Sequence, residues 1–143
     1  MSYLVCHMEK YHKTDICHIE EENERDENYV GSNNCIDHTK TKTNYRLLIR
    51  NSSYTDFINT RISELNLPKA PRKDAVLMAS FVVGSDRDFF KKLDEEQQNF
   101  FFRDCTEFFV KRYGRKNIIS AVVHNDETTP HLHLNLIPVK DNR

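Results

Sequence analysis

A chain of 143 residues is long enough for one domain with a real hydrophobic core. No apolar run approaches the roughly 18–20 residues that a membrane span requires, and the amino terminus, MSYLVCHMEKYHK, lacks a signal-peptide pattern. These features exclude a membrane partner and predict a cytoplasmic protein. The four cysteines are scattered without a C-x-x-C pair, so we expect free thiols.

The net charge of −1 does not by itself indicate a nucleic-acid binder, but the charges are unevenly distributed along the chain. Residues 15–27 are strongly acidic, whereas residues 38–73 are rich in lysine and arginine. A basic face beside an acidic segment would cancel in the net count. Such runs are also compatible with an ordinary solvated surface, so the charge pattern alone leaves both interpretations open.

The first half of the chain predicts two strands, a long loop and a helix. Residues 2–8 alternate in polarity and predict a strand, and residues 44–50 predict a second one. Residues 9–42 lack periodicity and predict a long loop with room for some helix, a length that usually has a function. Ser53 is a natural N-cap for a helix over 54–66, whose apolar residues fall on one face.

The second half predicts a strand, a short helix, a long helix and a strand hairpin. The strand covers 75–83 and ends at Gly84. Asp94 and Gln97 form a capping-box pattern at the start of a helix over 95–113. The strands of the hairpin are expected at 117–124 and 131–139.

This order of elements predicts an α+β fold. The short connections favour antiparallel pairing of the strands. We therefore expect an antiparallel β-sheet with helices on one face, formed by residues 1–143 as a single domain.

Three histidines stand out in the last two predicted strands. Because side chains at i and i+2 of a strand share a face, His131 and His133 project together, while Leu132 and Leu134 project toward the core. His124 ends the preceding strand and can reach the same place if the two strands are neighbours. Three imidazoles converging from adjacent strands predict a divalent-cation site with open coordination positions.

An open position allows a metal ion to hold a substrate oxygen as a Lewis acid. Asp126 or Glu127 is the expected partner that orients one imidazole. The alternative is a set of exposed histidines on an edge hairpin. A single histidine would favour that alternative, whereas three in this arrangement favour the metal site.

Two families of enzymes carry comparable histidine patterns. The stretch HLHLNLIP is similar to the alternating motif of histidine-triad nucleotide hydrolases, but Asn135 stands where their third histidine would be. The longer stretch HNDETTPHLHLNLIP fits every fixed position of the third motif of the Mob/Pre plasmid mobilisation relaxases, a family of HUH endonucleases.

The resemblance to the Mob/Pre family extends over nearly the whole chain. The segments MSYLVCHM, NER at 23–25 and NYRL at 44–47 resemble its opening strand, its first motif and the strand that follows. RKDAVLMASFVVGSDRDFF at 72–90 and LDEEQQNFFFRDCTEFFVKRYG at 93–114 resemble its central strand and helices.

The resemblance implies a relaxase, an enzyme that nicks one DNA strand at a plasmid or transposon origin of transfer. Such enzymes stay attached to the 5′ phosphate and later rejoin the ends, and the implied partner is single-stranded or hairpin DNA. The implied cofactor is Mn²⁺ or Mg²⁺ against the scissile phosphate. The implied metal ligands are His124, His131 and His133, and the implied DNA contacts are Arg25, Asn44, Arg72 and Lys73.

The first motif departs from the family pattern at the expected nucleophile. Where the family usually reads His-x-x-Arg, this chain reads ENER, so Glu22 stands in place of the histidine. A carboxylate can attack phosphorus to give an acyl phosphate. Other HUH enzymes use tyrosine, and both Tyr29 and Tyr45 are nearby in sequence. Glu22, Tyr45 and Glu127 are therefore the candidate catalytic residues, and a loss of the nucleophile is the alternative.

The family's relaxase domain normally continues with further helices and a dimerisation region. The resemblance therefore implies either a fragment or a compact relative, and a homodimer formed through that further region. A DNA-binding module that keeps the metal site but lacks a nucleophile is the main alternative function.

Overall fold

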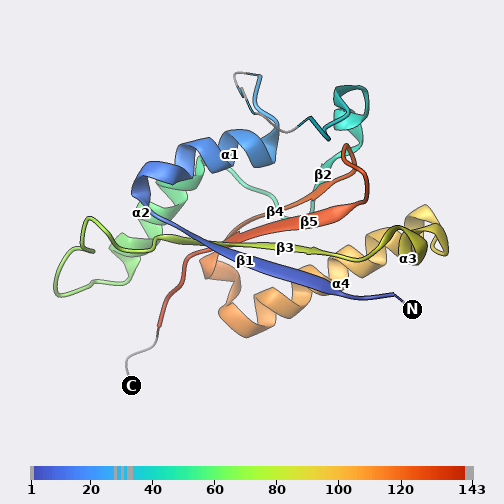
Figure 1. The fold of residues 1–143 in the computed structure, drawn as a ribbon. Coiled ribbons are helices and arrows are strands. Elements are labelled where there is room, and N and C mark those ends of the chain that lie inside the picture. The colour runs from blue at the N-terminus through green and yellow to red at the C-terminus, as the bar shows by residue number, and fades with distance from the viewer. Residues whose placement is uncertain (1, 28, 30, 32–33, 141–143) are drawn as a thin grey trace.

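A single sheet organises the molecule. The computed structural model describes residues 2–27, 29, 31 and 34–140, and within these residues five strands pair in the order β1-β3-β5-β4-β2 (Figure 1). All pairings are antiparallel, which confirms the α+β fold expected from the sequence. The strands are β1 Val5–Tyr11, β2 Tyr45–Arg46, β3 Met78–Gly84, β4 Ile118–His124 and β5 His131–Leu136.

The helices begin largely where the sequence indicates. Ser53 accepts a hydrogen bond from the Asp56 backbone N–H at 3.1 Å, and Asp94 and Gln97 form the expected capping box. In the part of the chain that the structure describes, no helix is both long and apolar enough to cross a membrane. The α-helices are α1 Ile16–Glu24, α2 Tyr54–Glu64, α3 Arg87–Lys91 and α4 Glu95–Tyr113, and the short 3₁₀ segments are η1 Lys13–Asp15, η2 His38–Thr43 and η3 Arg115–Asn117.

The expectation that the helices lie on one face holds for α3 and α4 but not for α1 and α2, which pack on the opposite face (Figure 1). Ile16 of α1 and Ile58 of α2 are buried together with Ile119 of β4 in a second, smaller apolar cluster. A register shift between Ile118 and Ser120 in β4 allows Ile118 and Ala121, three residues apart, to face the main core together, while Ile119 joins the second cluster.

The main core lies between the sheet and α4. Alternate residues of β3, β4 and β5 point to this face, where Phe102 and Phe109 of α4 cover them. The buried residues contributed by the sheet are Ala79, Val83, Ile118, Ala121, Val123, Leu132, Leu134 and Leu136.

Two expectations for the first half of the chain need correction. Within the segment expected to be mainly loop, β1 continues to Tyr11 and α1 forms a nine-residue helix. The second strand is only two residues long, and beyond it the Leu47 N–H still donates to the Ala121 carbonyl at 2.8 Å. Tertiary ion pairs accompany the formation of α1, because Arg46 at the end of β2 and Arg50 after it both bind Glu24 of this helix.

Candidate metal centre

The pairing of β4 and β5 brings three histidines together. His124 lies opposite His131 in the antiparallel register, and His133 follows on the same face of β5. The ring centroid of His133 lies 4.1 Å from that of His124 and 4.7 Å from that of His131. With Glu127 from the connecting turn, these side chains offer ligand atoms that all lie within 4.8 Å of one another.

One nitrogen of each histidine points into the cluster as a possible metal ligand. Nε2 of His124 lies 2.7 Å from the Asn23 carbonyl and therefore donates to it, so Nδ1 carries a lone pair, which faces Nη2 of Arg25 at 3.3 Å. Nδ1 of His131 likewise donates to the Thr129 carbonyl at 2.9 Å, which leaves Nε2. Nε2 of His133 is buried without a hydrogen-bond partner. A buried imidazole nitrogen without a partner, in a group of three histidines and a carboxylate, fits a divalent metal ion.

Glu127 connects the cluster to a buried arginine. Its carboxylate oxygens lie 3.4 Å from Nε2 of His131 and 3.9 Å from Nδ1 of His124. It also accepts a hydrogen bond from Nη2 of Arg25 at 2.9 Å. Glu127 can therefore act as a metal ligand or as the group that orients His131.

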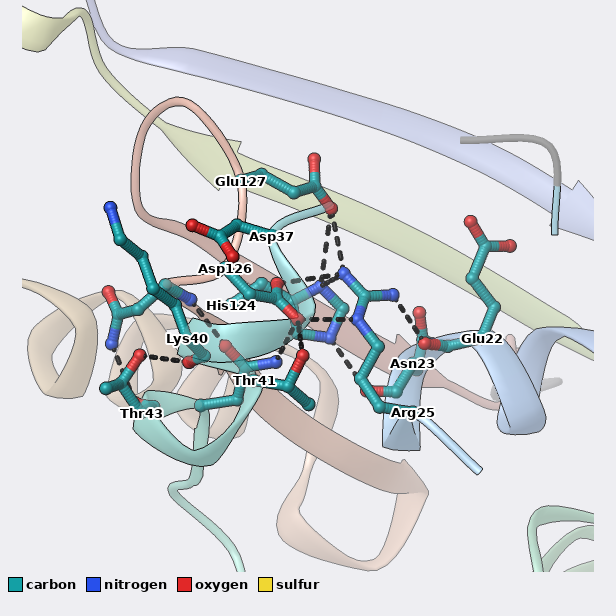
Figure 2. A network of polar contacts seen from close by, with 12 residues as sticks. Glu22, Asn23, Arg25, Asp37, Lys40, Thr41, Thr43, His124, Asp126 and Glu127 are labelled. Carbon is teal, nitrogen blue, oxygen red and sulfur yellow. Dashed lines mark hydrogen bonds and ion pairs between the residues drawn. The ribbon is translucent and has the colours of Figure 1, made fainter. Parts of the chain in front are cut away.

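Arg25 is held by carboxylates on the β4–β5 turn (Figure 2). Its Nε and Nη2 donate to the two oxygens of Asp126 at 2.9 and 3.1 Å, and Nη1 donates to the Glu22 carbonyl at 2.7 Å. Nη2 also lies 3.3 Å from Nδ1 of His124. Its side chain is 7% exposed and its backbone is left-handed, with φ of 51° at the C-cap of α1. The guanidinium expected to contact DNA is thus used inside the protein.

Asp126 is fully buried and binds η2 as well as Arg25. Its Oδ2 accepts hydrogen bonds from Thr41 Oγ1 and Asn44 Nδ2, both at 2.9 Å. Oδ1 of Asn44 accepts from the Asn125 backbone N–H at 2.7 Å, so this amide is also engaged within the protein instead of facing solvent. Burial raises the pKa of Asp126, but the hydrogen bonds and charge of Arg25 with those of Asn44 and Thr41 outweigh it and hold the pKa well below its usual range.

The electrostatics of the cluster keep two imidazoles neutral. Burial and the positive charge of Arg25 lower the pKa of His124 to about 4, and burial with the neighbouring histidines lowers that of His133 well below its usual value. Burial acts in the same direction on His131, but the hydrogen bond and charge of Glu127 raise its pKa overall. Near neutral pH, His124 and His133 therefore present lone pairs, which metal ligation requires.

Glu22 lies on α1, three residues before Arg25, and is not among the four residues whose ligand atoms gather. Figure 2 shows the Glu22 side chain extending away from the Arg25–His124 contact. Its carboxylate and that of Glu127 both lie in the upper half of the view. Tyr29 lies near Glu22 and shares a side-chain hydrogen bond with it; burial, the charge of Glu22 and this hydrogen bond all raise the pKa of the tyrosine.

Tyr45 is not brought to the histidines. It pairs with Val123 of β4, and its side chain packs on the main core, on the face of the sheet opposite His133. Its hydroxyl is buried without a hydrogen-bond partner, and burial raises its pKa to about 12. This geometry does not suit a nucleophile that must reach the metal centre.

Arg72 and Lys73 are also distant from the cluster. They lie in the loop before β3, which enters the sheet beside Tyr11, whereas β3 leaves it beside His131 at Gly84 (Figure 1). The length of the strand separates the two ends by roughly 20 Å. Arg72 is largely exposed and pairs with Asp74 at 3.3 Å.

Sequence reasoning missed several groups that organise the cluster. The carbonyls of Asn23 and Thr129 orient two imidazoles, and no side-chain pattern reveals a backbone acceptor. The role of Thr41 could not be predicted, because it binds Asp126 from a segment 85 residues away in the sequence. The NER motif was the available signal, since it contains both Asn23 and Arg25.

The chain matches known proteins over its whole length. The family model described as plasmid recombination enzyme, Mob_Pre, matches residues 1–143. The chain is 40% identical to a plasmid recombination enzyme type 2 of Staphylococcus aureus and 38% identical to a plasmid recombination enzyme of Streptococcus agalactiae, with all of this chain covered in both cases. It spans 34% and 29% of these relatives, so it corresponds to about a third of their length.

Solved structures agree with the family model. The relaxase domain of MobM, bound to plasmid pMV158 oriT DNA of 22 nucleotides with a 3′ thiophosphate and to Mn, superposes with a TM-score of 0.91 at 37% identity. The match covers 99% of this chain and 73% of that one. The same domain bound to 26 nucleotides of oriT DNA gives a TM-score of 0.80 at 34% identity, over 99% and 72% of the two chains. The resemblance inferred from the motifs is confirmed: the chain belongs to the Mob_Pre family of plasmid recombination enzymes.

Proposed function

We propose that this protein is a metal-dependent relaxase that nicks and rejoins one DNA strand at an origin of transfer. The observation that carries the proposal is the cluster of His124, His131, His133 and Glu127, in which Nε2 of His133 is buried without a partner. Family membership supports it, as does the likeness to a relaxase domain solved with Mn and oriT DNA. We propose Mn²⁺ or Mg²⁺ as the cofactor.

The three histidines would hold the metal ion, with Glu127 as a further ligand or as the orienting partner of His131. When bound, the ion supplies Lewis-acid stabilisation of charge on the scissile phosphate. Arg25 holds Asp126 and Glu127 in place, and the Asn23 and Thr129 carbonyls fix two of the rings. These contacts give the ligands a fixed geometry before DNA arrives.

We propose Glu22 as the nucleophile. Its carboxylate oxygen would bond to phosphorus while the bond from phosphorus to the 3′ oxygen breaks, and the 3′ oxygen leaves as a hydroxyl after taking a proton from water. The product is an acyl phosphate that joins Glu22 to the 5′ end of the DNA. The position of Glu22 beside Arg25, at the end of α1 that contacts His124 through Asn23, supports this role.

The further assignments follow from this function. We propose residues 1–143 as a single relaxase domain that acts on single-stranded or hairpin origin DNA in the cytoplasm, where plasmid DNA lies. Arg72 and Lys73 are proposed to contact DNA beyond the cleavage site. A homodimer would form through a region found in longer relatives.

A covalent-capture experiment tests the proposal. The protein is incubated with Mn²⁺ and single-stranded DNA that includes both the pMV158 origin and a random-sequence pool, and adducts that resist denaturation are isolated. We expect an adduct that hydroxylamine cleaves, because acyl phosphates are labile to it whereas tyrosyl phosphodiesters are not. Glu22→Gln should abolish the adduct, and Tyr45→Phe should leave it unchanged.

Two other outcomes would change the assignment. Loss of the adduct in Tyr29→Phe, with full activity in Glu22→Gln, would transfer the nucleophile to Tyr29, whose pKa responds to the nearby Glu22. Metal and DNA binding without an adduct in any variant would leave a DNA-binding module without nicking activity.

A further inference from the structure

The segment η2 carries two lysines in its last turn. Lys40 and Lys42 are both exposed, and within the described residues no ion pair engages either ammonium group. Asp37, whose carboxylate accepts hydrogen bonds from Thr39, is close enough for the charge of Lys40 to contribute to lowering its pKa. Figure 2 shows the Lys40 side chain extending away from the polar network.

Hydrogen bonds from the residues directly after His124 hold η2 in position. The Asp37 N–H donates to the Asp126 carbonyl at 2.6 Å, and Thr41 Oγ1 donates to the Asp126 carboxylate at 2.9 Å. At the other end of η2, Asn125 Nδ2 donates to the Thr43 carbonyl at 2.9 Å. Both ends of the segment are therefore attached to the strand end that carries a candidate metal ligand.

Apart from a bound metal ion, the cluster itself offers little positive charge to the phosphates that flank the scissile one. Asp126 and Glu127 neutralise Arg25, whose guanidinium is buried among their oxygens. The Debye length is about 10 Å at 0.1 M salt, so lysines attract a phosphate effectively only from nearby. Since η2 is hydrogen-bonded to Asn125 and Asp126, directly after His124, its lysines are carried by a segment at the histidine end of the sheet, whereas Arg72 and Lys73 are at the other end.

We propose that Lys40 and Lys42 bind phosphates of the DNA strand next to the scissile phosphate, and that Asp126 positions them there. This inference rests on the proposed function, because it names the residues that hold the substrate of that same site. Asp126 thus has two roles, since its carboxylate holds Arg25 on one side and η2 on the other.

The test is the salt dependence of DNA binding. The affinity of the protein for the 22-nucleotide single-stranded pMV158 origin and for a 22-nucleotide oligothymidine is measured between about 50 and 200 mM salt. Each lost phosphate contact should reduce the slope of log K against log salt by about 0.7 for single strands, so Lys40→Ala with Lys42→Ala should reduce it by about 1.4. Over this range the wild type should lose about sevenfold more affinity than the double variant.

The matched control is Lys111→Ala with Lys116→Ala, which removes the same charge from the last turn of α4 and from η3, at the end of β4 opposite His124. It should keep the wild-type slope. An equal loss of slope in both double variants, or no loss in the η2 variant, would overturn the inference. Failure of the wild type to bind either oligonucleotide would instead contradict the proposed function.

A second variant tests the positioning role of Asp126. Thr41→Val removes one hydrogen bond to Asp126 and keeps both lysines. We expect weaker binding with an unchanged salt slope, because the lysines still reach phosphate but are less well ordered. An unchanged affinity would remove the positioning role from the inference. Calorimetry with Mn²⁺ should give about one site in every variant, which shows that the cluster is intact.

Discussion

The two faces of the sheet differ in how their side chains are held in place. On the α4 face, β5 contributes Leu132, Leu134 and Leu136 to an apolar core. On the opposite face, the alternate residues of the same strand are His131, His133 and Asn135, each placed among polar groups. The first face depends on the amount of apolar surface it buries, which tolerates exchange among similar side chains. The second depends on individual hydrogen bonds from distant segments.

The polar face shows what this dependence requires. Asn135 is fully buried, donates to Ser120 at 2.9 Å and accepts a hydrogen bond from Ser80. It thus has partners on both neighbouring strands, in the position where histidine-triad hydrolases would carry a histidine. Substitutions of the histidines on this face should change function more than stability, and substitutions of the leucines on the other face should do the reverse.

The largest effect is expected at the histidines. His131→Ala combined with His133→Ala should abolish binding of Mn²⁺ and the formation of a DNA adduct, because two of three imidazole ligands are lost. Calorimetry measures the first and denaturing gels the second, with circular dichroism to show that the variant folds. Unchanged metal binding would rule out the proposed metal centre.

Removing Arg25, which lies on the histidine face, should reduce the stability of the protein as well as its function. Arg25→Ala leaves Asp126 buried without its counter-charge, which typically costs about 3–5 kcal/mol. Urea unfolding of the metal-free protein measures this cost. The exposed Arg87→Ala is a suitable control and should change stability by less than about 0.5 kcal/mol. If Arg25→Ala lowers the free energy of unfolding by less than about 1 kcal/mol, the Arg25–Asp126 ion pair is poorly formed.

On the apolar face, Leu134→Ala should reduce the free energy of unfolding by about 2–5 kcal/mol through lost burial and a residual cavity. Leu134 is fully buried, and its neighbours along β5 are His133 and Asn135. Metal affinity per folded molecule should stay within about threefold of wild type. A large loss of metal affinity in a folded Leu134→Ala protein would contradict the division of roles between the two faces.

Acidification should destabilise the metal-free protein through the histidine face. The folded pKa of His124 is about 4, below its ordinary value of 6.5, so the unfolded chain binds more protons between these values and stability falls as pH falls. Between pH 7 and pH 5 the contribution of His124 is about 2 kcal/mol. His133 acts in the same direction, whereas His131, with its raised pKa, opposes it.

Unfolding in urea at several pH values tests this expectation, with His124→Asn as the comparison. The variant should show a smaller dependence on pH than the wild type. Equal slopes for the two proteins would mean that His124 titrates normally. The charged and titratable groups that surround the ring are Arg25, Asp126, Glu127, His131 and His133.

The smallest effect is expected for Tyr45→Phe. The Tyr45 hydroxyl is buried without a partner, so its removal should leave stability unchanged or increase it by about 1 kcal/mol. Nicking activity should not change, because the ring packs on the α4 face. Loss of the DNA adduct in this variant would show that Tyr45 reaches the histidine face.

The comparison also explains which features the sequence could predict. Periodicity and capping residues are local, and they placed α4 at its observed bounds and the antiparallel hairpin that joins His124 to His131. The acidic segment of α1 has little apolar periodicity. The helix is held in part by ion pairs of Glu20 and Glu24 with Arg50. Partners more than 25 residues apart leave no local pattern, so this segment was expected to be mainly loop.

The same limit applies to the site. The three histidines could be grouped because two lie at i and i+2 and the third ends the adjoining strand. Arg25 and Asn44 could be recognised as important, but not as partners of Asp126, since each lies more than 80 residues from it. Their motifs indicated a role in the site, and only the fold shows that the role is internal.

The left-handed backbone of Arg25 has an energetic consequence of its own. A non-glycine residue in this region is strained, typically by about 1–3 kcal/mol, and glycine would relieve that strain. Glycine, however, could not hold Asp126 and Glu127. Conformational strain at the end of α1 is thus maintained by the contacts of the side chain. Breaking those contacts should release the C-terminal end of α1. We therefore expect this helix end and the β4–β5 turn to unfold locally together, as one cooperative unit.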